Sequence, residues 1–136
     1  LPGGGTTDYA IEIYHEAIKN SRYDCFLTED TELPMMFMDD AIKATVNIME
    51  AKKESIKIRS SYNLSAISFT PKQIAESIQM HIPDFSITYT RDFRQDIADS
   101  WPKSIDDSRA REDWNWQHAF SLENITQEML NQLSKK

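Results

Sequence analysis

The chain of 136 residues has the length of about one domain, and its 40% hydrophobic and 27% charged residues form a globular rather than a disordered mixture. Its 22 acidic and 15 basic side chains give a net charge of −7, which argues against general binding to nucleic acids or anionic membranes because both need basic surface. No apolar run approaches the ~20 residues of a membrane-spanning helix.

The first feature in chain order is a glycine-rich opening, where we expect a flexible loop. The only three glycines are Gly3, Gly4 and Gly5, which follow Leu1 and Pro2. Because they stand together, no GxGxxG or GxxxxGK[ST] phosphate loop can be written in the chain. No apolar stretch follows a basic start, so a signal peptide is not expected. The opening is consistent with a tag scar or with a piece of a longer protein.

Apolar spacing and cap residues predict helices and short strands along the rest of the chain. The helices are expected over residues 8–20, 41–54, 71–82, 107–114 and from 121 onward, and the strands over residues 23–27, 33–38, 62–69 and 85–89. Residues 93–100 are ambiguous. The pattern is of the α/β type, with too few strands in succession to close a doubly wound sheet alone.

The clearest local signals are helix starts. Thr70 fits the N-cap, Pro71 the first helical position and Gln73 the third residue of a capping box. Ser121 is expected to cap the last helix.

The second helix carries two features of interest. Asp39 or Asp40 is expected to cap it and to complement its dipole, rather than to serve as a catalytic or metal-binding pair. Ile42, Val46 and Met49 fall on one apolar stripe at helical spacing.

Histidine and cysteine chemistry is not indicated. His15, His81 and His118 lie far apart, form neither an HxxxH nor an HExxH pair, and are expected to be ordinary surface or interface histidines. Cys25 has no CxxC partner and lies in an apolar strand, which predicts a buried, inert thiol and a reducing compartment.

The methionine cluster and two tryptophans are interpreted as packing residues. Met35, Met36 and Met38 are expected in the core, and Trp114 and Trp116 on a short packed helix. No tyrosine is followed by a lysine four residues later, so the Tyr-x-x-x-Lys pair that keeps a phenol acidic beside a nicotinamide is absent.

Four segments together resemble one family. They are PGGGTTDYA at residues 2–10, LPMMFMDDA at 33–41, YNLSA and FTP within 62–71, and SWP and DDSRAREDW within 100–114. They resemble the C-terminal part of the short-chain-type L-threonine 3-dehydrogenases, which belong to the extended short-chain dehydrogenases beside the nucleotide-sugar epimerases. The resemblance covers essentially the whole chain and is most specific in PGGGTTDYA and SWP.

The resemblance implies that substrate binding and cofactor binding lie in different parts of a longer enzyme. Residues 1–136 would be one mixed helix/strand unit, the C-terminal substrate lobe of an extended short-chain dehydrogenase. An N-terminal Rossmann half, absent here, would hold NAD and the Tyr-x-x-x-Lys pair. The parent would oxidise L-threonine to 2-amino-3-oxobutanoate by hydride transfer to NAD. This chain alone would carry no catalytic, cofactor-binding or metal-binding residue and no activity.

The resemblance also implies partners and a compartment. The partners would be L-threonine, the Rossmann half and, at full length, a second copy in a dimer, with no nucleic acid and no membrane. The compartment would be the cytoplasm in a bacterium and the mitochondrion in a eukaryote. A lobe without its other half should expose an apolar face, including part of the run 35–38, so we expect the chain alone to self-associate.

Three substrate-binding residues follow from the resemblance. Thr6 and Thr7 match threonines that contact the amino-acid substrate, and a glycine loop at a helix N-terminus offers N–H groups and hydroxyls to a carboxylate. The alternative is that Thr6, Thr7 and Asp8 only cap the helix. Trp101 matches a tryptophan that helps to shut the site, although with Pro102 it could instead be an apolar contact between lobes.

Two other functions stay open. One is a nucleotide-sugar epimerase or dehydratase of the same group, in which the strand before the two aspartates resembles Arg-x-Tyr and the arginine grips a diphosphate. Here that stretch is Leu33-Pro34-Met35, an apolar wall that suits a small substrate better. The other is an interaction domain that works at this length.

Overall fold

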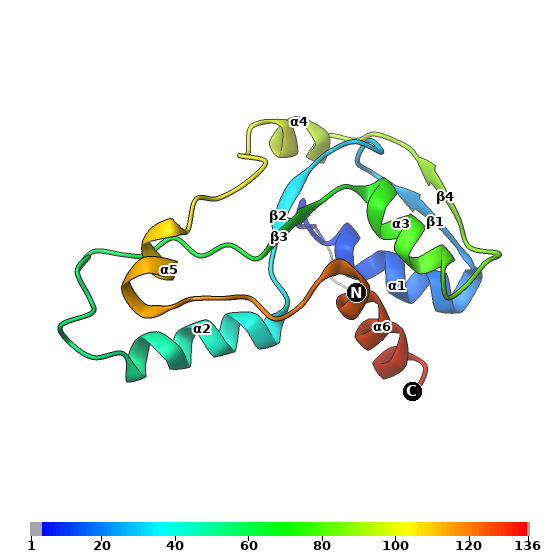
Figure 1. Ribbon diagram of the computed structural model, residues 1–136. Helices are drawn as coiled ribbons and strands as arrows, with labels where there is room; N and C mark the ends of the chain where they lie inside the picture. Colours follow the sequence, from blue (N-terminus) through cyan, green and yellow to red (C-terminus); the bar gives the residue numbers. More distant parts are fainter. Residues whose placement is uncertain (1–3, 136) are drawn as a thin grey trace.

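The computed structural model describes residues 4–135, so the expected opening loop lies partly outside it, at Leu1, Pro2 and Gly3. The elements follow one another along the chain as α1 (Tyr9–Asn20), β1 (Arg22–Cys25), β2 (Leu33–Met35), α2 (Met38–Glu50), β3 (Ile67–Phe69), α3 (Pro71–Gln79), β4 (Ser86–Tyr89), α4 (Arg94–Asp99), α5 (Ser108–Trp114) and α6 (Leu122–Leu133) (Figure 1). The expected mixture of helices and strands is confirmed, and the ambiguous segment forms the short helix α4.

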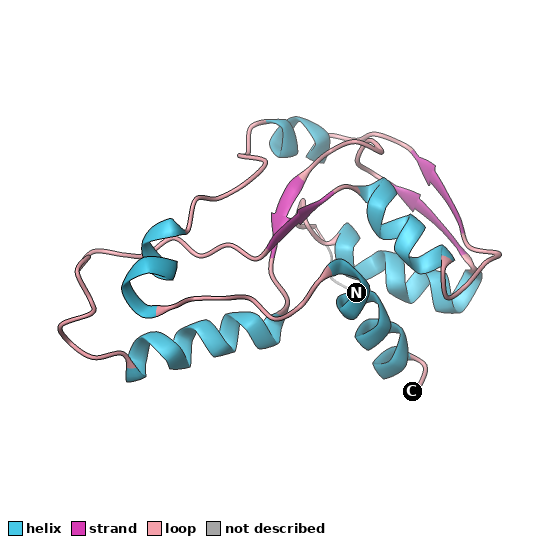
Figure 2. Ribbon diagram, in the orientation of Figure 1, coloured by secondary structure: helices cyan, strands magenta, loops and turns pink. Residues whose placement is uncertain are grey.

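The strands make two separate two-stranded sheets within residues 4–135 (Figure 2). β1 pairs with β4 in parallel, and β2 pairs with β3 antiparallel. Neither pair amounts to a doubly wound sheet, as the strand count predicted. In the described part of the chain, no helix is long and apolar enough to cross a membrane.

The larger core lies where α1, α3 and α6 meet the β1–β4 sheet. Three buried hydroxyls join the three helices: Thr126 bonds the Tyr14 hydroxyl at 2.9 Å and accepts from Ser77 at 2.8 Å. Cys25 is fully buried in this core, and burial raises the pKa of its thiol to about 11. The expected buried thiol is therefore confirmed.

A second, smaller core lies between α2 and α5. Ala44 packs there with Ala110, Trp114 and Trp116, and the two indole rings are 6.1 Å apart. The prediction that these tryptophans are packing residues is confirmed.

The capping box expected at Thr70 and the cap expected at Ser121 are confirmed. The Thr70 hydroxyl accepts from the Gln73 N–H at 3.2 Å, and the Gln73 side chain accepts from the Thr70 N–H at 2.9 Å. Ser121 and Asn124 make the same reciprocal pair at the start of α6. These bonds join residues three positions apart, which is why local spacing reveals them.

The expected cap of α2 is wrong. The N-cap position is Phe37, and α2 begins at Met38 rather than at 41. Asp40 is buried in the first turn and accepts from the N–H groups of Ala119 and Phe120, at 2.7 and 3.1 Å. Asp39 is exposed beside it. Asp40 therefore ties α2 to a distant segment, because its carboxylate satisfies two backbone donors that lack other partners in a loop.

The apolar residues around α2 also differ from expectation. The stripe of Ile42, Val46 and Met49 is present, but it is exposed, whereas Ala44 on another face is buried. Met38 is 65% exposed as well, so the prediction of a methionine core is wrong there. Its neighbours Met35 and Met36 are half-buried.

The strand expected over 62–69 shortens to β3. Before β3, the Ser65 N–H donates to Asp107 at 3.2 Å and the Ser65 carbonyl accepts from the Trp116 indole at 3.0 Å. Side chains thus satisfy backbone groups that a neighbouring strand would otherwise pair.

Candidate functional site

The three predicted substrate-binding residues lie in two places. Thr6 and Thr7 precede α1, where Thr6 is buried and Thr7 is half-buried. Trp101 follows α4 and is 42% exposed. Thr7 and Trp101 line different hollows of the surface, so the described residues do not bring them into one pocket.

Asp8 closes the glycine loop. Its Oδ2 accepts from the backbone N–H groups of Gly4 and Gly5, each at 3.0 Å. These bonds hold the pKa of the Asp8 carboxyl below its usual value because they stabilise the charged form. A Cβ at Gly5 would lie 2.7 Å from Oδ1 of Asp8, so a larger residue there would displace the Asp8 carboxylate.

This conformation changes the chemistry that the loop offers. We expected its N–H groups to face a substrate carboxylate, but those of Gly4 and Gly5 already bind Asp8. Asp8 does not cap α1 through its side chain, because its backbone is helical (φ −63°, ψ −22°) rather than extended. The hydroxyls of Thr6 and Thr7 take no part in the bonds to Asp8.

Thr7 lines an apolar hollow of about 320 Å³ between α1, the end of β2 and α6. Its other lining residues are Ala10, Ile11, Tyr14, Met35, Met36, Phe37, Met38, Phe69, Ile125 and Met129. A threonine hydroxyl at the edge of such a wall can orient a small ligand by one directional bond, while the wall excludes water.

Trp101 lines a polar hollow of about 180 Å³ at the end of α4. The backbone N–H of Trp101 donates to the Ala98 carbonyl at 3.0 Å, which extends the helical turn beyond Asp99. The opposite wall is formed by the loop that follows β1, including Thr28 and Thr31.

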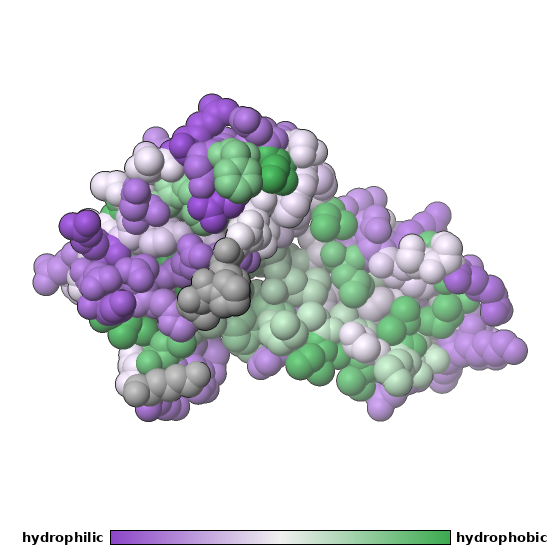
Figure 3. Space-filling view, turned by 180° about the vertical axis from the view of Figure 1, so that it is seen from behind, coloured by the Kyte–Doolittle hydropathy of each residue, from purple (hydrophilic) through white to green (hydrophobic). Residues whose placement is uncertain are grey.

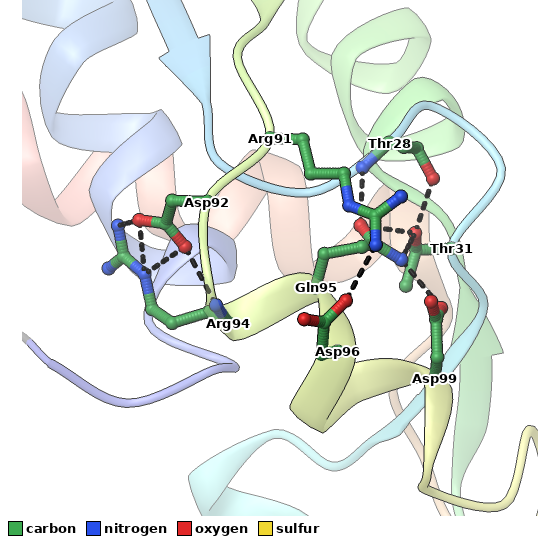
Figure 4. Close-up of polar contacts among 8 residues, drawn as sticks. All are labelled: Thr28, Thr31, Arg91, Asp92, Arg94, Gln95, Asp96 and Asp99. Carbon is green, nitrogen blue, oxygen red and sulfur yellow. Dashed lines mark hydrogen bonds and ion pairs between the residues drawn. The ribbon is translucent and has the colours of Figure 1, made fainter.

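Gln95 fastens α4 to this loop (Figure 4). Its buried side-chain carbonyl accepts from the Thr28 N–H at 2.8 Å and from the Thr31 hydroxyl at 3.2 Å. Its amide donates to Asp99 at 2.6 Å. Because every bond of the side chain points across the loop or along α4, Gln95 sets the position from which Trp101 projects.

Arg94 makes the other polar anchor of α4 (Figure 4). It pairs with Asp92 through two nitrogens, at 3.0 and 2.6 Å, and its guanidinium lies over the ring of Phe26. The Arg94 guanidinium holds the pKa of the Asp92 carboxyl below its usual value. A bidentate pair stacked on an aromatic ring is a use for which arginine is better suited than lysine.

Sequence reasoning missed the roles of Asp8, Gln95 and Arg94. A signal existed for Asp8, because an aspartate three residues after a glycine can bond back to the loop N–H groups. No local signal existed for Gln95, whose partners Thr28 and Thr31 lie 67 and 64 residues away.

The next feature is the placement of metal-ligating side chains. Within residues 4–135 no three side chains of histidine, cysteine, aspartate or glutamate are placed to hold a metal ion. His15 lies beside a surface hollow with Glu12 and Glu16, on α1.

No protein-family model matches the sequence. Individual proteins do match it closely. The mitochondrial L-threonine 3-dehydrogenase of Bos taurus is 53% identical over 131 residues, which are 96% of this chain and 35% of the relative. An uncharacterized epimerase/dehydratase of Staphylococcus haemolyticus is 48% identical over 136 residues, which are 99% of this chain and 43% of the relative.

Solved structures give the same result. The crystal structure of L-threonine dehydrogenase from Phytophthora infestans matches with a TM-score of 0.94 and 53% identity, over 98% of this chain and 44% of that one. The apo form of a GalE-like L-threonine dehydrogenase from Cupriavidus necator matches with a TM-score of 0.93 and 51% identity, over 98% and 48% of the two chains.

The chain thus spans between a third and a half of the length of these relatives. It matches their C-terminal part, and its mixed helix/strand fold is theirs. The resemblance and the fold class inferred from the sequence are confirmed.

Proposed function

We propose that this chain is the substrate-binding part of an epimerase-like, NAD-dependent L-threonine 3-dehydrogenase. The observation that carries the proposal is the 53% identity to the Bos taurus enzyme over 96% of the chain. Because the chain spans only 35% of that relative, oxidation of L-threonine to 2-amino-3-oxobutanoate is proposed for the longer protein and not for this part alone.

The wall beside Thr7 supports a small substrate. Met35 and Thr7 line the same hollow, and Leu33 of the same strand is fully buried. Neither Leu33 nor Met35 can bind a diphosphate, which requires the positive charge of an arginine or lysine. An amino acid has no diphosphate to satisfy, and its short side chain suits an apolar surface.

A nucleotide-sugar epimerase or dehydratase is the second candidate. The 48% identity to the Staphylococcus haemolyticus relative, which bears that description, favours it. The apolar wall at Met35 weighs against it.

Within the proposed enzyme, NAD would accept the hydride, and we assign its binding to the part of the protein that precedes this chain. The residues present do not fit a dinucleotide. The single glycine loop has its Gly4 and Gly5 N–H groups bound to Asp8, and the negative charge of Asp8 would repel a phosphate there.

The residues of this chain would bind and cover the substrate. The hydroxyls of Thr6 and Thr7 would donate to the threonine carboxylate. Trp101, held at the end of the anchored helix α4, would close over the site. The closure needs a movement of one lobe or loop, because Trp101 and Thr7 line separate hollows.

The functional assay uses the full-length protein, with the residues that its gene places before Leu1. We expect NADH to form with L-threonine and not with a nucleotide sugar. Turnover of a nucleotide sugar without threonine oxidation would select the second candidate.

At full length we also expect a dimer by gel filtration, and a mitochondrial location in a eukaryotic source or a cytoplasmic one in a bacterium.

Trp101→Ala tests the closure. Loss of one large apolar side chain from the bound state removes about 1.5–3 kcal/mol, so kcat/KM for L-threonine should fall roughly tenfold or more. Phe93→Ala is the matched control, because Phe93 is an exposed aromatic residue at the other end of α4. Equal, small effects of both changes would show that Trp101 does not cover the substrate.

A further inference from the structure

Four apolar side chains form one exposed strip along α2. They are Met38, Ile42, Val46 and Met49, and we refer to them as the α2 stripe. Their exposed fractions are 65, 56, 44 and 78%. We propose that the α2 stripe is an internal docking surface, covered in the full-length protein by the part of the same polypeptide that precedes Leu1. This inference rests on the proposed function, which assigns the chain to a longer enzyme.

The first argument is that α2 is apolar on two faces. Ala44 is buried and Ile48 packs against the Trp114–Trp116 core, so this face already has its partner. At 100° per residue, the α2 stripe lies on another side of the helix. A helix at the surface of a globular protein has one apolar face, and a helix that is apolar on more sides is enclosed on more sides.

The second argument is that the exposed side chains are contiguous. Positions 38, 42, 46 and 49 are one turn apart and lie above one another. Figure 3 shows apolar side chains gathered on the face of the lobe that contains α2 and α5. Single exposed apolar residues are ordinary, whereas a contiguous patch marks an interaction site.

The third argument identifies the occupant. More than half of each relative lies outside the match, and the match is to their C-terminal part, so the additional chain comes before Leu1. The described start of the chain lies near the first turn of α2, because Thr7 and Met38 line the same hollow. The α2 stripe therefore begins near the described start of the chain, which is the end to which the additional part would be attached.

A second copy of this chain is the competing occupant. When the preceding part is missing, the α2 stripe has no internal cover, which gives the expected self-association a specific location. The two occupants differ in their dependence on protein concentration, because an internal contact is independent of it.

The stripe carries its own chemical probes. Exposed methionine is oxidised to the sulfoxide by peroxide, and covered methionine is protected. Met49 and Met38 belong to the stripe, whereas Met80, at the end of α3, is an internal control with 74% exposure. Peptide mass spectrometry after brief peroxide treatment would follow all three in the chain of 136 residues and in the full-length protein.

We expect Met80 to be oxidised at similar rates in both proteins and Met38 and Met49 to be several-fold slower in the full-length protein. Equal rates for the three methionines at full length would overturn the inference, as would a gene that places no domain before Leu1. Protection that appears only as the concentration of either protein rises would assign the stripe to a second copy.

Substitution gives a second readout. Val46→Glu should lower the Tm of the full-length protein by burying a charge at the contact, and should leave the Tm of the 136-residue chain nearly unchanged. Met80→Glu should leave both unchanged. An equal effect of Val46→Glu in the two proteins would contradict the docking role.

The outcome is separable from that of the proposed function. Threonine oxidation with an unprotected stripe would refute the docking surface alone. Protection of Met38 and Met49 in a protein that does not oxidise threonine would refute the function alone.

Discussion

At the scale of single residues, the structure sharpens the choice between two roles for Thr7. Within residues 4–135, no side-chain hydroxyl or carboxylate at residues 6–8 bonds a helical N–H of α1, so the capping alternative lacks its hydrogen bond. Thr7 instead lines the apolar hollow beside Met35. The position of Thr7 at this hollow favours the proposed contact with the substrate.

Thr7→Val in the full-length enzyme tests that contact, because it keeps the shape and removes the hydroxyl. A hydrogen bond to a charged group is worth roughly 1.5–3 kcal/mol, so kcat/KM for L-threonine should fall roughly ten- to more than a hundredfold. The affinity for NAD and the Tm should hardly change.

Thr90→Val is the matched control, since Thr90 is an exposed threonine that bonds only Asp24 through its hydroxyl. Steady-state kinetics and melting curves on both variants distinguish a substrate contact of Thr7 from a structural role. A lower Tm of Thr7→Val with normal kcat/KM would mean that Thr7 is a structural residue.

Asp8 gives a prediction for acid stability. Its folded pKa lies below the usual 3.8 because it accepts from Gly4 and Gly5. A depressed pKa contributes stability that is fully present above the unfolded pKa and is lost as pH falls through the folded pKa. Asp8→Asn should therefore lower the Tm at neutral pH, and the difference from the unaltered chain should begin to shrink near pH 3.8 and disappear once the pH falls below the folded pKa of Asp8.

Melting curves from neutral pH to about pH 2 measure this dependence. Asp84→Asn, at an exposed carboxylate before β4, serves as the comparison and should have little effect at neutral pH. A constant difference between Asp8→Asn and the unaltered chain across the range would show that the charge of Asp8 does not stabilise the loop.

At the scale of elements, two adjacent aspartates of α2 make a direct comparison. Asp40 is buried and accepts from the N–H groups of Ala119 and Phe120, whereas Asp39 is exposed. Asp40→Ala leaves two donors without an acceptor, at about 1.5–3 kcal/mol for each charged bond lost, so the free energy of unfolding should fall by about 3 kcal/mol or more. Asp39→Ala should change it by less than about 0.5 kcal/mol.

Urea denaturation of the two variants checks this prediction, and Asp40→Asn should lie between them because it keeps one acceptor. Equal destabilisation by Asp39→Ala and Asp40→Ala would mean that the effect comes from the helix dipole, which both residues complement, and not from the tie to Ala119.

The same elements show what the sequence could reveal. The caps at Thr70 and Ser121 were predictable because each joins residues three positions apart. The bonds of Asp40 span 79 and 80 residues, and spacing within α2 carries no information about such partners. Spacing within α2 likewise predicted the apolar stripe. It could not show which of the two apolar faces of α2 is buried in this chain.

The candidate site follows a similar division. Thr6, Thr7 and Trp101 were named through a family resemblance, which local chemistry alone could not have supplied. The arrangement behind Trp101 depends on Gln95, and its bonds to Thr28 and Thr31 arise from tertiary packing. The sequence therefore indicated Thr6, Thr7 and Trp101 as candidate residues, and the fold shows the neighbours that hold Trp101 in place.

At the scale of the whole molecule, polar bonds and an aromatic pair connect two cores. The core around α1, α3 and α6 is separate from that of α2 and α5 (Figure 1). Asp40 bonds Ala119 and Phe120, and the Lys43 ammonium donates to the Gln117 carbonyl at 3.1 Å. The rings of Phe37 and Phe120 also lie 4.6 Å apart beside these bonds.

The final prediction concerns NAD. The described residues form two two-stranded sheets, of which only β1–β4 is parallel, and so lack the many-stranded parallel sheet at whose edge a dinucleotide binds. The glycine loop is not free to replace such an edge, because Asp8 binds the N–H groups of Gly4 and Gly5. Titration calorimetry with the 136-residue chain should therefore show no NAD binding and the dehydrogenase assay no turnover, whereas the full-length protein should show both. Micromolar NAD affinity in the isolated chain would place a cofactor site within these residues and would overturn the assignment of the cofactor to the preceding half.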